Sequence, residues 1–190
     1  TPVGPIDLCT SDGGNTYTTA TLTCTNYSSD LTWTYGETTP SITVSAPDNY
    51  DVTYTDPGTG CSSISSAVSV AGLNAAVDPT GVTTNITTNN VNNICLGNAV
   101  LLGVDGGFVG DGAVWHWYEG TGACGTGTAR GTGASVSITP TTLGVHHYTV
   151  RSEGPCGNSS CASIDINVTT GPPSGTVHIT STFGSGCVGA

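Results

Sequence analysis

One stretch, Ala113-Val-Trp-His-Trp-Tyr118, constrains the fold of this chain more than any other. In a β-strand successive side chains point to opposite faces, so Ala113, Trp115 and Trp117 share one face. Two neighbouring indoles form a large apolar surface, and a buried Trp on a central strand commonly anchors a two-sheet sandwich. The stretch therefore predicts the central strand of a β-sandwich.

A weaker copy of this pattern occurs in the first half of the chain. Leu31, Trp33 and Tyr35 alternate with threonines, which predicts a strand with these three side chains on one face. The two patterns together indicate two copies of one module.

Composition supports β-structure throughout. The chain has 190 residues, with 28 glycines, 10 prolines, no methionine and only two basic residues, Arg130 and Arg151. Thr, Ser and Val, which favour strands and turns, make up much of the remainder, and no window shows sustained helical spacing of apolar residues. We expect an all-β chain of two tandem sandwiches plus a C-terminal strand. The expected domains are residues 1–73, residues 74–170, and a final segment, residues 171–190, that holds a linker and a single strand.

The formal net charge of −11 argues against two classes of partner. Neutralising phosphates requires Lys and Arg, so we expect neither nucleic acid nor an anionic membrane surface as a partner. No apolar run is long enough to span a bilayer, so we expect no membrane insertion.

The chain contains eight cysteines. In a small glycine-rich β-protein this number indicates disulfides and an oxidising, extracellular location. Zinc sites favour closely spaced C-x-x-C pairs, which are absent, because the nearest pair is Cys156 and Cys161. We therefore expect structural disulfides rather than metal thiolates.

Both halves resemble known repeat modules. Leu31–Val44, Tyr50–Asp56 and Gly60-Cys61 resemble the immunoglobulin-like repeats of large surface proteins in gliding Bacteroidota. The second half is similar to their PKD-like module through Gly106-Gly107, Gly112–Tyr118, Cys124-Gly125, Ser137–Pro140, Tyr148–Gly154, Cys156 and Cys161. The resemblance implies immunoglobulin-like sandwiches, secretion by the type IX route, and a stalk or adhesin role.

Few residues suggest a chemical site. Asp105 and Asp111 flank a glycine-rich loop and are weak candidates for calcium, although the EF-hand pattern is absent. No other cofactor is expected. Adjacent His146 and His147 point to opposite faces of a strand and cannot chelate one ion together. No nucleophile motif such as G-x-S-x-G occurs, so we do not expect an enzyme.

Arg151 lies on a predicted strand beside the Trp strand, with Glu119 and Glu153 close in sequence or in space. We expect it to form an ion pair on a half-exposed sheet face.

The expected core anchors are the three tryptophans and two tyrosines. Trp33 should face Tyr50 and Val52 between the sheets of module one. Trp117, with Trp115 partly buried, should face Tyr148 and Val150 in module two.

The sequence allows two alternative sets of disulfide pairs. Strand ends in an up-down sandwich favour the pairs Cys24–Cys61, Cys95–Cys124 and Cys156–Cys161. Likeness between the modules favours Cys9–Cys61 with Cys95–Cys156, and connectivity does not follow from sequence alone. The first set leaves Cys9 and Cys187, which become candidates for an intersubunit disulfide.

The tail Thr176–Cys187 repeats the opening of module two, where Ile86 leads to Cys95 much as Ile179 leads to Cys187. The tail therefore predicts the first strand of an incomplete module. It could dock on module one of the next subunit, with Cys187 bonded to Cys9, or belong to a longer repeat array.

These patterns favour an extracellular structural or adhesive protein in a cell-surface stalk or fibre. One alternative is a filament subunit completed head to tail by a neighbour's strand. Another is a glycan-binding module of a secreted hydrolase. The expected partners are copies of this chain or adjacent repeats, and surface glycans.

Overall fold

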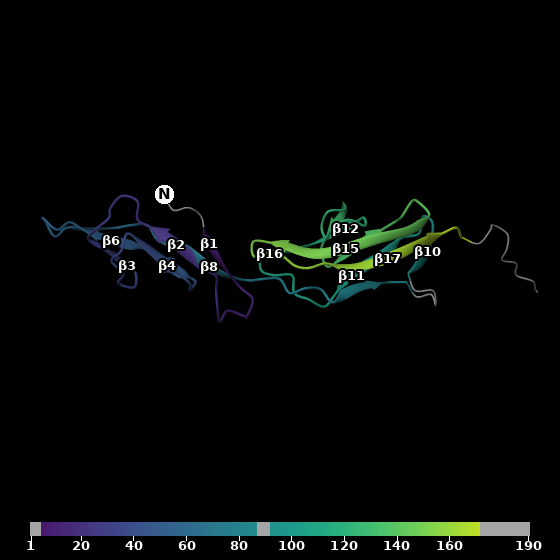
Figure 1. Ribbon diagram of the computed structural model, residues 1–190, viewed down its shortest axis with the longest axis horizontal. Helices are drawn as coiled ribbons and strands as arrows, with labels where there is room; N and C mark the ends of the chain where they lie inside the picture. The colour runs from purple at the N-terminus through teal and green to yellow at the C-terminus, as the bar shows by residue number, and fades with distance from the viewer. Residues whose placement is uncertain (1–4, 87–91, 172–190) are drawn as a thin grey trace, which may run out of the picture.

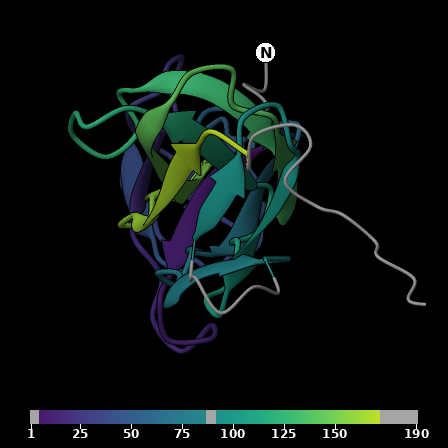
Figure 2. The ribbon, with the colours of Figure 1, turned by 90° about the vertical axis from the view of Figure 1, so that its right-hand side faces the viewer.

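The computed structural model describes residues 5–86 and 92–171, and in that part of the chain the regular structure consists of β-strands alone. Two modules lie end to end, which gives the long molecule of Figure 1 and the narrow outline of the end-on view in Figure 2. Each module is a two-layer immunoglobulin-like sandwich, so the chain is all-β. In the described residues no helix is long and apolar enough to cross a membrane.

In residues 5–74, module one has eight short strands. One layer is the pair β2-β4. The other contains the sheets β1-β8-β5 and β3-β6-β7, which continue into each other along the chain because β5 precedes β6 and β7 precedes β8. The strands are β1 (Ile6–Thr10), β2 (Ala20–Thr23), β3 (Leu31–Trp33), β4 (Ser41–Val44), β5 (Asp48–Tyr50), β6 (Val52–Thr55), β7 (Ser62–Ile64) and β8 (Val68–Asn74).

Module two has a fuller version of the same plan. Its layers are β14-β11-β9 and β10-β17-β15-β12-β13, with β16 beside β15. The strands are β9 (Gly81–Thr84), β10 (Asn93–Cys95), β11 (Val100–Asp105), β12 (Val114–Glu119), β13 (Thr128–Thr132), β14 (Ser135–Ile138), β15 (Gly144–Gly154), β16 (Gly157–Asn158) and β17 (Ala162–Thr169).

Parallel pairing at the end of each module is a shared feature. β1 runs parallel to β8, and β10 runs parallel to β17, while the other named pairs are antiparallel. The first of these strands follows the start of its module, and the second is the last strand of that module. In each module, a strand from the first part of the module therefore pairs in parallel with the last strand.

Each module has its own hydrophobic core. Trp33, Trp115 and Trp117 are all buried, and so are Tyr50 and Tyr148. The indole Nε1 of Trp117 donates to the carbonyl oxygen of Gly133 at 2.9 Å, which satisfies its polar atom inside the core.

The expected facing pairs need correction. Val52 and Val150 do not lie opposite the tryptophans across the sandwich, because Trp33 pairs with Val52, and Trp117 with Val150, on neighbouring strands of one sheet. The residues across the sandwich come from the other layer: Leu22, Ile42 and Val44 in module one, and Val100, Leu102 and Ile138 in module two.

Tyr35 also departs from expectation. It was expected to share the buried face of Leu31 and Trp33, but β3 ends at Trp33 and the side chain of Tyr35 is 63% exposed. The amide of Gly36 donates to the carbonyl of Trp33 at 2.8 Å, so the chain turns before Tyr35 can reach the core.

Candidate functional site: the joint between the modules

The segment between β8 and β9, residues 75–80, joins the two modules and is hydrogen-bonded to both. The amide of Ala75 donates to the carbonyl of Thr10 in module one at 2.7 Å. Val77 and Phe108 exchange two backbone hydrogen bonds, of 2.9 and 3.1 Å, with module two. The segment is thus a strand-like bridge that pairs with both modules, and not a free tether.

Asp111 closes one side of this joint. Its Oδ2 accepts hydrogen bonds from the backbone amide and from the side-chain amide of Asn74, each at 2.8 Å. Its own amide donates to the carbonyl of Asn74 at 3.0 Å. These hydrogen bonds from Asn74 lower the pKa of the Asp111 carboxyl below 3.8, because they stabilise the charged form.

The glycines of the loop between Asp105 and Gly112 serve this joint. A Cβ on Gly107 would lie 2.9 Å from the carbonyl oxygens of Val77 and Asp78, and one on Gly110 would lie 2.9 Å from the amide of Ala76. Both glycines have positive φ, at 73° and 87°. The loop can approach the linker backbone only because these positions lack side chains.

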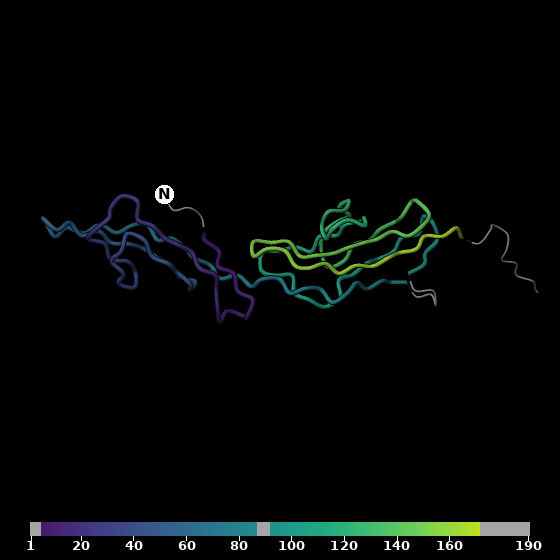
Figure 3. Tube along the Cα trace, viewed as in Figure 1, coloured from purple at the N-terminus to yellow at the C-terminus, as the bar shows by residue number. Residues whose placement is uncertain are grey.

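A disulfide locks the same joint. Cys9 on β1 is bonded to Cys156 in the β15–β16 turn, with the two Cα atoms 5.5 Å apart and a sequence separation of 147. Beside it, Asp78 Oδ1 accepts a hydrogen bond from the amide of Ser160 at 2.8 Å. The peptide chain runs from one module into the other, as the trace in Figure 3 shows. A disulfide and hydrogen bonds connect the modules in addition.

The second disulfide joins Cys124 to Cys161 within module two, with the Cα atoms 5.8 Å apart. Among the described residues Cys24, Cys61 and Cys95 are unbonded. Cys187 lies outside the described residues.

The disulfide expectations were wrong in both versions. Cys95–Cys124 does not form because Cys95 lies beside Thr169 at the end of β17, whereas Cys124 meets Cys161 just before β17 begins. Cys156–Cys161 does not form because Cys156 bonds across the joint.

Cys24–Cys61 is also absent, since both cysteines are unbonded in the described part of the chain. The competing pairs Cys9–Cys61 and Cys95–Cys156 fail because Cys9 and Cys156 bond to each other. For the same reason the expected intersubunit pair of Cys9 with Cys187 is wrong, since Cys9 already has a partner.

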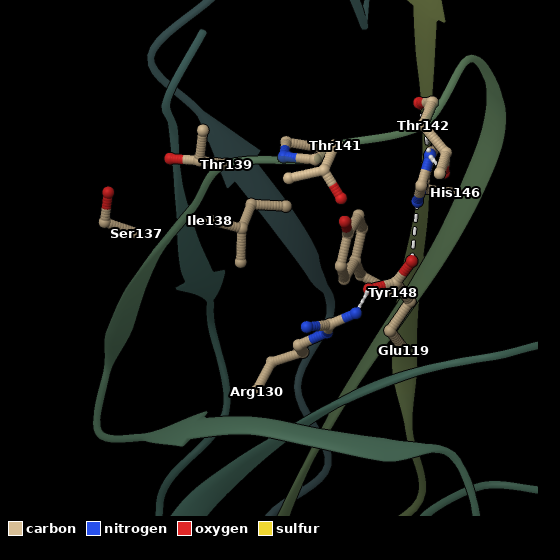
Figure 4. A pocket seen from close by; sticks show the side chains of 10 residues that line it. Glu119, Arg130, Ser137, Ile138, Thr139, Thr141, Thr142, His146 and Tyr148 are labelled. Carbon is tan, nitrogen blue, oxygen red and sulfur yellow. Dashed lines mark hydrogen bonds and ion pairs between the residues drawn. The ribbon is translucent and has the colours of Figure 1, made fainter. Parts of the chain in front are cut away.

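A polar hollow of about 440 Å³ lies on module two, lined by Glu119, Arg130, His146 and Tyr148 (Figure 4). Glu119 forms ion pairs with Arg130 of β13 and with His146 Nδ1 of β15, the latter at 2.6 Å. His146 Nε2 lies 3.0 Å from the carbonyl oxygen of Thr142. The three charged side chains thus tie β12, β13 and β15 together.

The electrostatics of this cluster follow from its geometry. Burial opposes ionisation of Glu119, but the hydrogen bond with His146 and the charge of Arg130 outweigh it and lower the pKa of Glu119. The hydrogen bond to Glu119 raises the pKa of His146 above 6.5. Burial raises the pKa of Tyr148 to about 12, so its hydroxyl stays neutral. The cluster is a set of compensated charges.

Arg151 and Glu153 form another ion pair on module two. Arg151 Nε lies 2.7 Å from Glu153 Oε1, which also accepts from the Tyr118 hydroxyl at 2.5 Å. Arg151 was expected near both Glu153 and Glu119, but Glu119 pairs with Arg130 instead.

Calcium was a weak expectation for Asp105 and Asp111. Oδ2 of the Asp111 carboxylate accepts two hydrogen bonds from Asn74. Within residues 5–86 and 92–171 no group of three or more His, Cys, Asp or Glu side chains could hold a metal ion.

Module one has an open groove of about 620 Å³ between β2 and the β7–β8 line, lined in part by Leu22, Tyr27, Ile64 and Val68. In module two β9 pairs with β11, and Val82 of β9 packs on the core. In the described part of module one, no strand pairs with the corresponding outer edge of β2. The groove lies where module one lacks the counterpart of β9.

No known protein family and no curated protein matches this sequence. Solved structures with a similar strand arrangement include the fibronectin(III)-like modules of Clostridium thermocellum CbhA, at 14% identity and a TM-score of 0.46, covering 96% of this chain and 97% of that one.

Two further similar structures cover less of their own chains. The three N-terminal domains of the bacteriophage RB49 outer capsid protein Hoc match at 20% identity and a TM-score of 0.30, over 82% of this chain and 55% of that chain. Immunoglobulin domains 1–4 of Sidekick-1 match at 13% identity and a TM-score of 0.29, over 87% of this chain and 49% of that chain. Similarity this low carries no argument about function. The chain is a tandem of two immunoglobulin-like sandwiches with two disulfides, a combination typical of extracellular domains.

Proposed function

We propose that this chain is a rigid segment of an extracellular stalk or fibre, like the repeat modules of large surface proteins in gliding Bacteroidota. The observation that carries the proposal is the joint. Interfaces between domains of one chain ordinarily permit relative motion unless they are large and apolar. Here Cys9–Cys156 and the bonds of Asn74 and Val77 fix two small modules in line.

A stalk needs length and stiffness more than it needs a pocket. Module surfaces rich in threonine and serine, with a net charge of −11, favour solubility and disfavour association of the chain sides. The length of the rod then comes from modules placed end to end, as in Figure 1.

Small-angle scattering tests the proposed rigidity. We expect the scattering of a straight rod, and we expect C9S/C156S combined with D111A to give a bent, broader ensemble with a smaller maximum dimension. C124S/C161S is the matched control, because it removes a disulfide inside module two and should leave the rod straight. A parent chain that is already bent and flexible in solution would contradict the proposal.

An adhesive role remains a separate proposal, with surface glycans as the expected ligand. A glycan array tests it directly. Binding of one sugar class, lost when the polar hollow is altered by R130Q, would support adhesion. If no glycan on the array binds, the proposal of glycan adhesion is wrong, whereas the proposed stalk role is unaffected.

A second candidate function is a filament subunit completed by strand addition. The open groove beside β2 supports it, because an added strand would pair with the free edge of β2 and cover the apolar residues of the groove. The proposed occupant is the tail of another copy around Val177 and Ile179, whose sequence repeats the start of module two. These residues lie outside the described residues.

Electron microscopy of the purified chain tests strand addition. We expect fibres from the parent chain and single rods from V177D/I179D. The control is T176D/T180D, which adds the same charge to the alternate positions of the same strand. Equal fibres from both variants would exclude this candidate function.

A further inference from the structure

Each module carries two cysteine-bearing elements, and the joint uses one from each module. The far end of a module is the end at which the chain leaves it, and the near end is the opposite one. The first element is the parallel strand at the far end, which is β1 with Cys9 in module one and β10 with Cys95 in module two. The second is the hairpin at the near end, β6–β7 with Cys61 or β15–β16 with Cys156. The Cys9–Cys156 bond joins the far end of module one to the near end of module two.

Cys95 occupies the position in module two that Cys9 occupies in module one. Cys9 pairs in register with Leu73 of β8, and Cys95 pairs with Thr169 of β17, so each cysteine lies beside the last strand of its module close to its exit. Both β1 and β10 are parallel to that last strand. The Cys95 side chain is only partly buried.

Cys61 similarly matches Cys156. Cys156 lies in the turn that pairs Gly154 with Gly157, and Cys61 directly follows the turn between β6 and β7. Its carbonyl accepts from the amide of Asp56 at 2.8 Å, which closes that turn. Cys61 is exposed, so its thiol is accessible to another chain.

The two elements whose cysteines are unbonded, the β6–β7 hairpin with Cys61 and β10 with Cys95, lie at opposite ends of the rod. In Figure 1 the hairpin that follows β6 forms the outer tip of module one, and β10 lies at the outer end of module two. The third unbonded cysteine of the described residues, Cys24, is partly buried and packs against the core of module one. The rod thus presents the two complementary halves of the bond that its own joint contains.

We propose that Cys95 of one copy forms a disulfide with Cys61 of a second copy, which reproduces the internal joint between chains. This inference rests on the proposed rod or filament function, and it adds the covalent contact and its direction. The contact is heterologous and does not close on itself, so it extends into a linear polymer.

The bond forms by thiol–disulfide exchange with a small disulfide such as oxidised glutathione. The Cys61 thiolate attacks that disulfide and releases one glutathione thiolate. The Cys95 thiolate then attacks the mixed disulfide and releases the second. Two protein thiols are oxidised and one small disulfide is reduced to two thiols, so the exchange is balanced.

Complementary variants test the pairing. In a glutathione redox buffer, the parent chain should give a ladder of multiples of 18.9 kDa on a non-reducing gel. C61S and C95S, each alone, should give no ladder. Their mixture should give one additional band, the dimer, because each chain keeps only one half of the bond. C24S and C187S are the matched controls and should keep the full ladder.

Peptide mapping of the dimer from the mixture should find Cys61 joined to Cys95. A parent chain that stays monomeric, a ladder that survives in C61S, or a Cys95–Cys95 dimer would each overturn the proposal. Scattering from C61S/C95S separates this outcome from failure of the rod itself. A straight monomeric rod without linkage removes the intersubunit bond alone, whereas a flexible monomer removes the proposed function.

Discussion

Asn74 donates both its backbone amide and its side-chain amide to one carboxylate oxygen of Asp111, at 2.8 Å each, across the boundary between the modules. Because a carboxylate accepts such bonds better than a neutral group does, this pair should protect the joint from opening. In D111A we expect faster amide hydrogen exchange at Asn74 and Val77, measured by NMR. D105A, at the other end of the same loop, should leave these rates unchanged.

The same pair predicts a pH dependence for the joint. The pKa of Asp111 is lower in the folded chain than its ordinary 3.8, so its contribution is present above 3.8 and is lost as the pH falls through the folded value. Exchange at Asn74 should therefore show an acid-induced opening step below pH 3.8 that is missing in D111A. An opening step that persists unchanged in D111A would assign it to another carboxyl.

The close approach of the glycine loop can be tested with Gly110. G110A places a Cβ 2.9 Å from the amide nitrogen of Ala76 at a φ of 87°, so we expect both backbone strain and separation of loop and linker. G97A is the matched control, with a φ of 82° and nothing within 4 Å of its Cβ. Urea unfolding should show a loss of about 1–2 kcal/mol for G97A and a larger loss for G110A. Equal losses would mean that the approach is not restrictive.

Trp117 should dominate the stability of module two. It is fully buried, and its replacement by Ala leaves a cavity and an unpaired carbonyl at Gly133. We expect W117A to lose about 3–5 kcal/mol in the free energy of unfolding of module two. V114A, on the same strand with its side chain 43% exposed, should change stability by less than about 0.5 kcal/mol. A W117A melting curve that overlays the parent would contradict the core assignment.

His146 should titrate above 6.5 in the folded chain, since its Nδ1 lies 2.6 Å from a Glu119 oxygen. NMR titration should show a lower pKa in E119Q, and a higher one in R130Q, because the guanidinium of Arg130 opposes protonation. The raised pKa means that the ion pair stabilises the fold fully below pH 6.5 and is lost as the pH rises through the folded value. A shift in the same direction in both variants would contradict the assignment.

Disulfide mapping of the purified chain checks the connectivity. We expect peptides that join Cys9 to Cys156 and Cys124 to Cys161. Removing the second bond with C124S/C161S should cost about 2–5 kcal/mol, mainly by freeing the unfolded chain. Recovery of Cys95 bonded to Cys156 would show that the joint is built differently.

The sandwich fold could be predicted from sequence because its signal is local. Alternation around Trp33 and Trp117 is a property of consecutive residues, and it identifies β3 and β12, of which β12 lies inside its sheet and β3 at the edge. β13 gave no such signal, since all five of its residues are exposed and its strand conformation depends on pairing with β12. Tyr35 was misplaced because the turn at Gly36 ends the strand early.

The joint could not be predicted because its partners are distant in sequence. Asp111 and Gly110 were visible as members of a glycine-rich loop, but that pattern fits a calcium loop equally well. Only the fold shows that the loop lies against Ala76. The cysteines failed for the same reason: pairing them within modules assumed that each module is closed, whereas Cys9 and Cys156 belong to different modules.

The Cys9–Cys156 bond changes how the molecule would carry a pulling force. Tension applied before Cys9 and beyond β17 crosses directly from β1 to the β15–β16 turn, so the residues between these cysteines are covalently excluded from extension. The remaining load runs along β17, which is held by antiparallel bonds to β15 and parallel pairing with β10. Because those hydrogen bonds lie across the direction of pull, they resist together in shear rather than opening one at a time. Beyond β1, the strands of module one lie outside this covalent path.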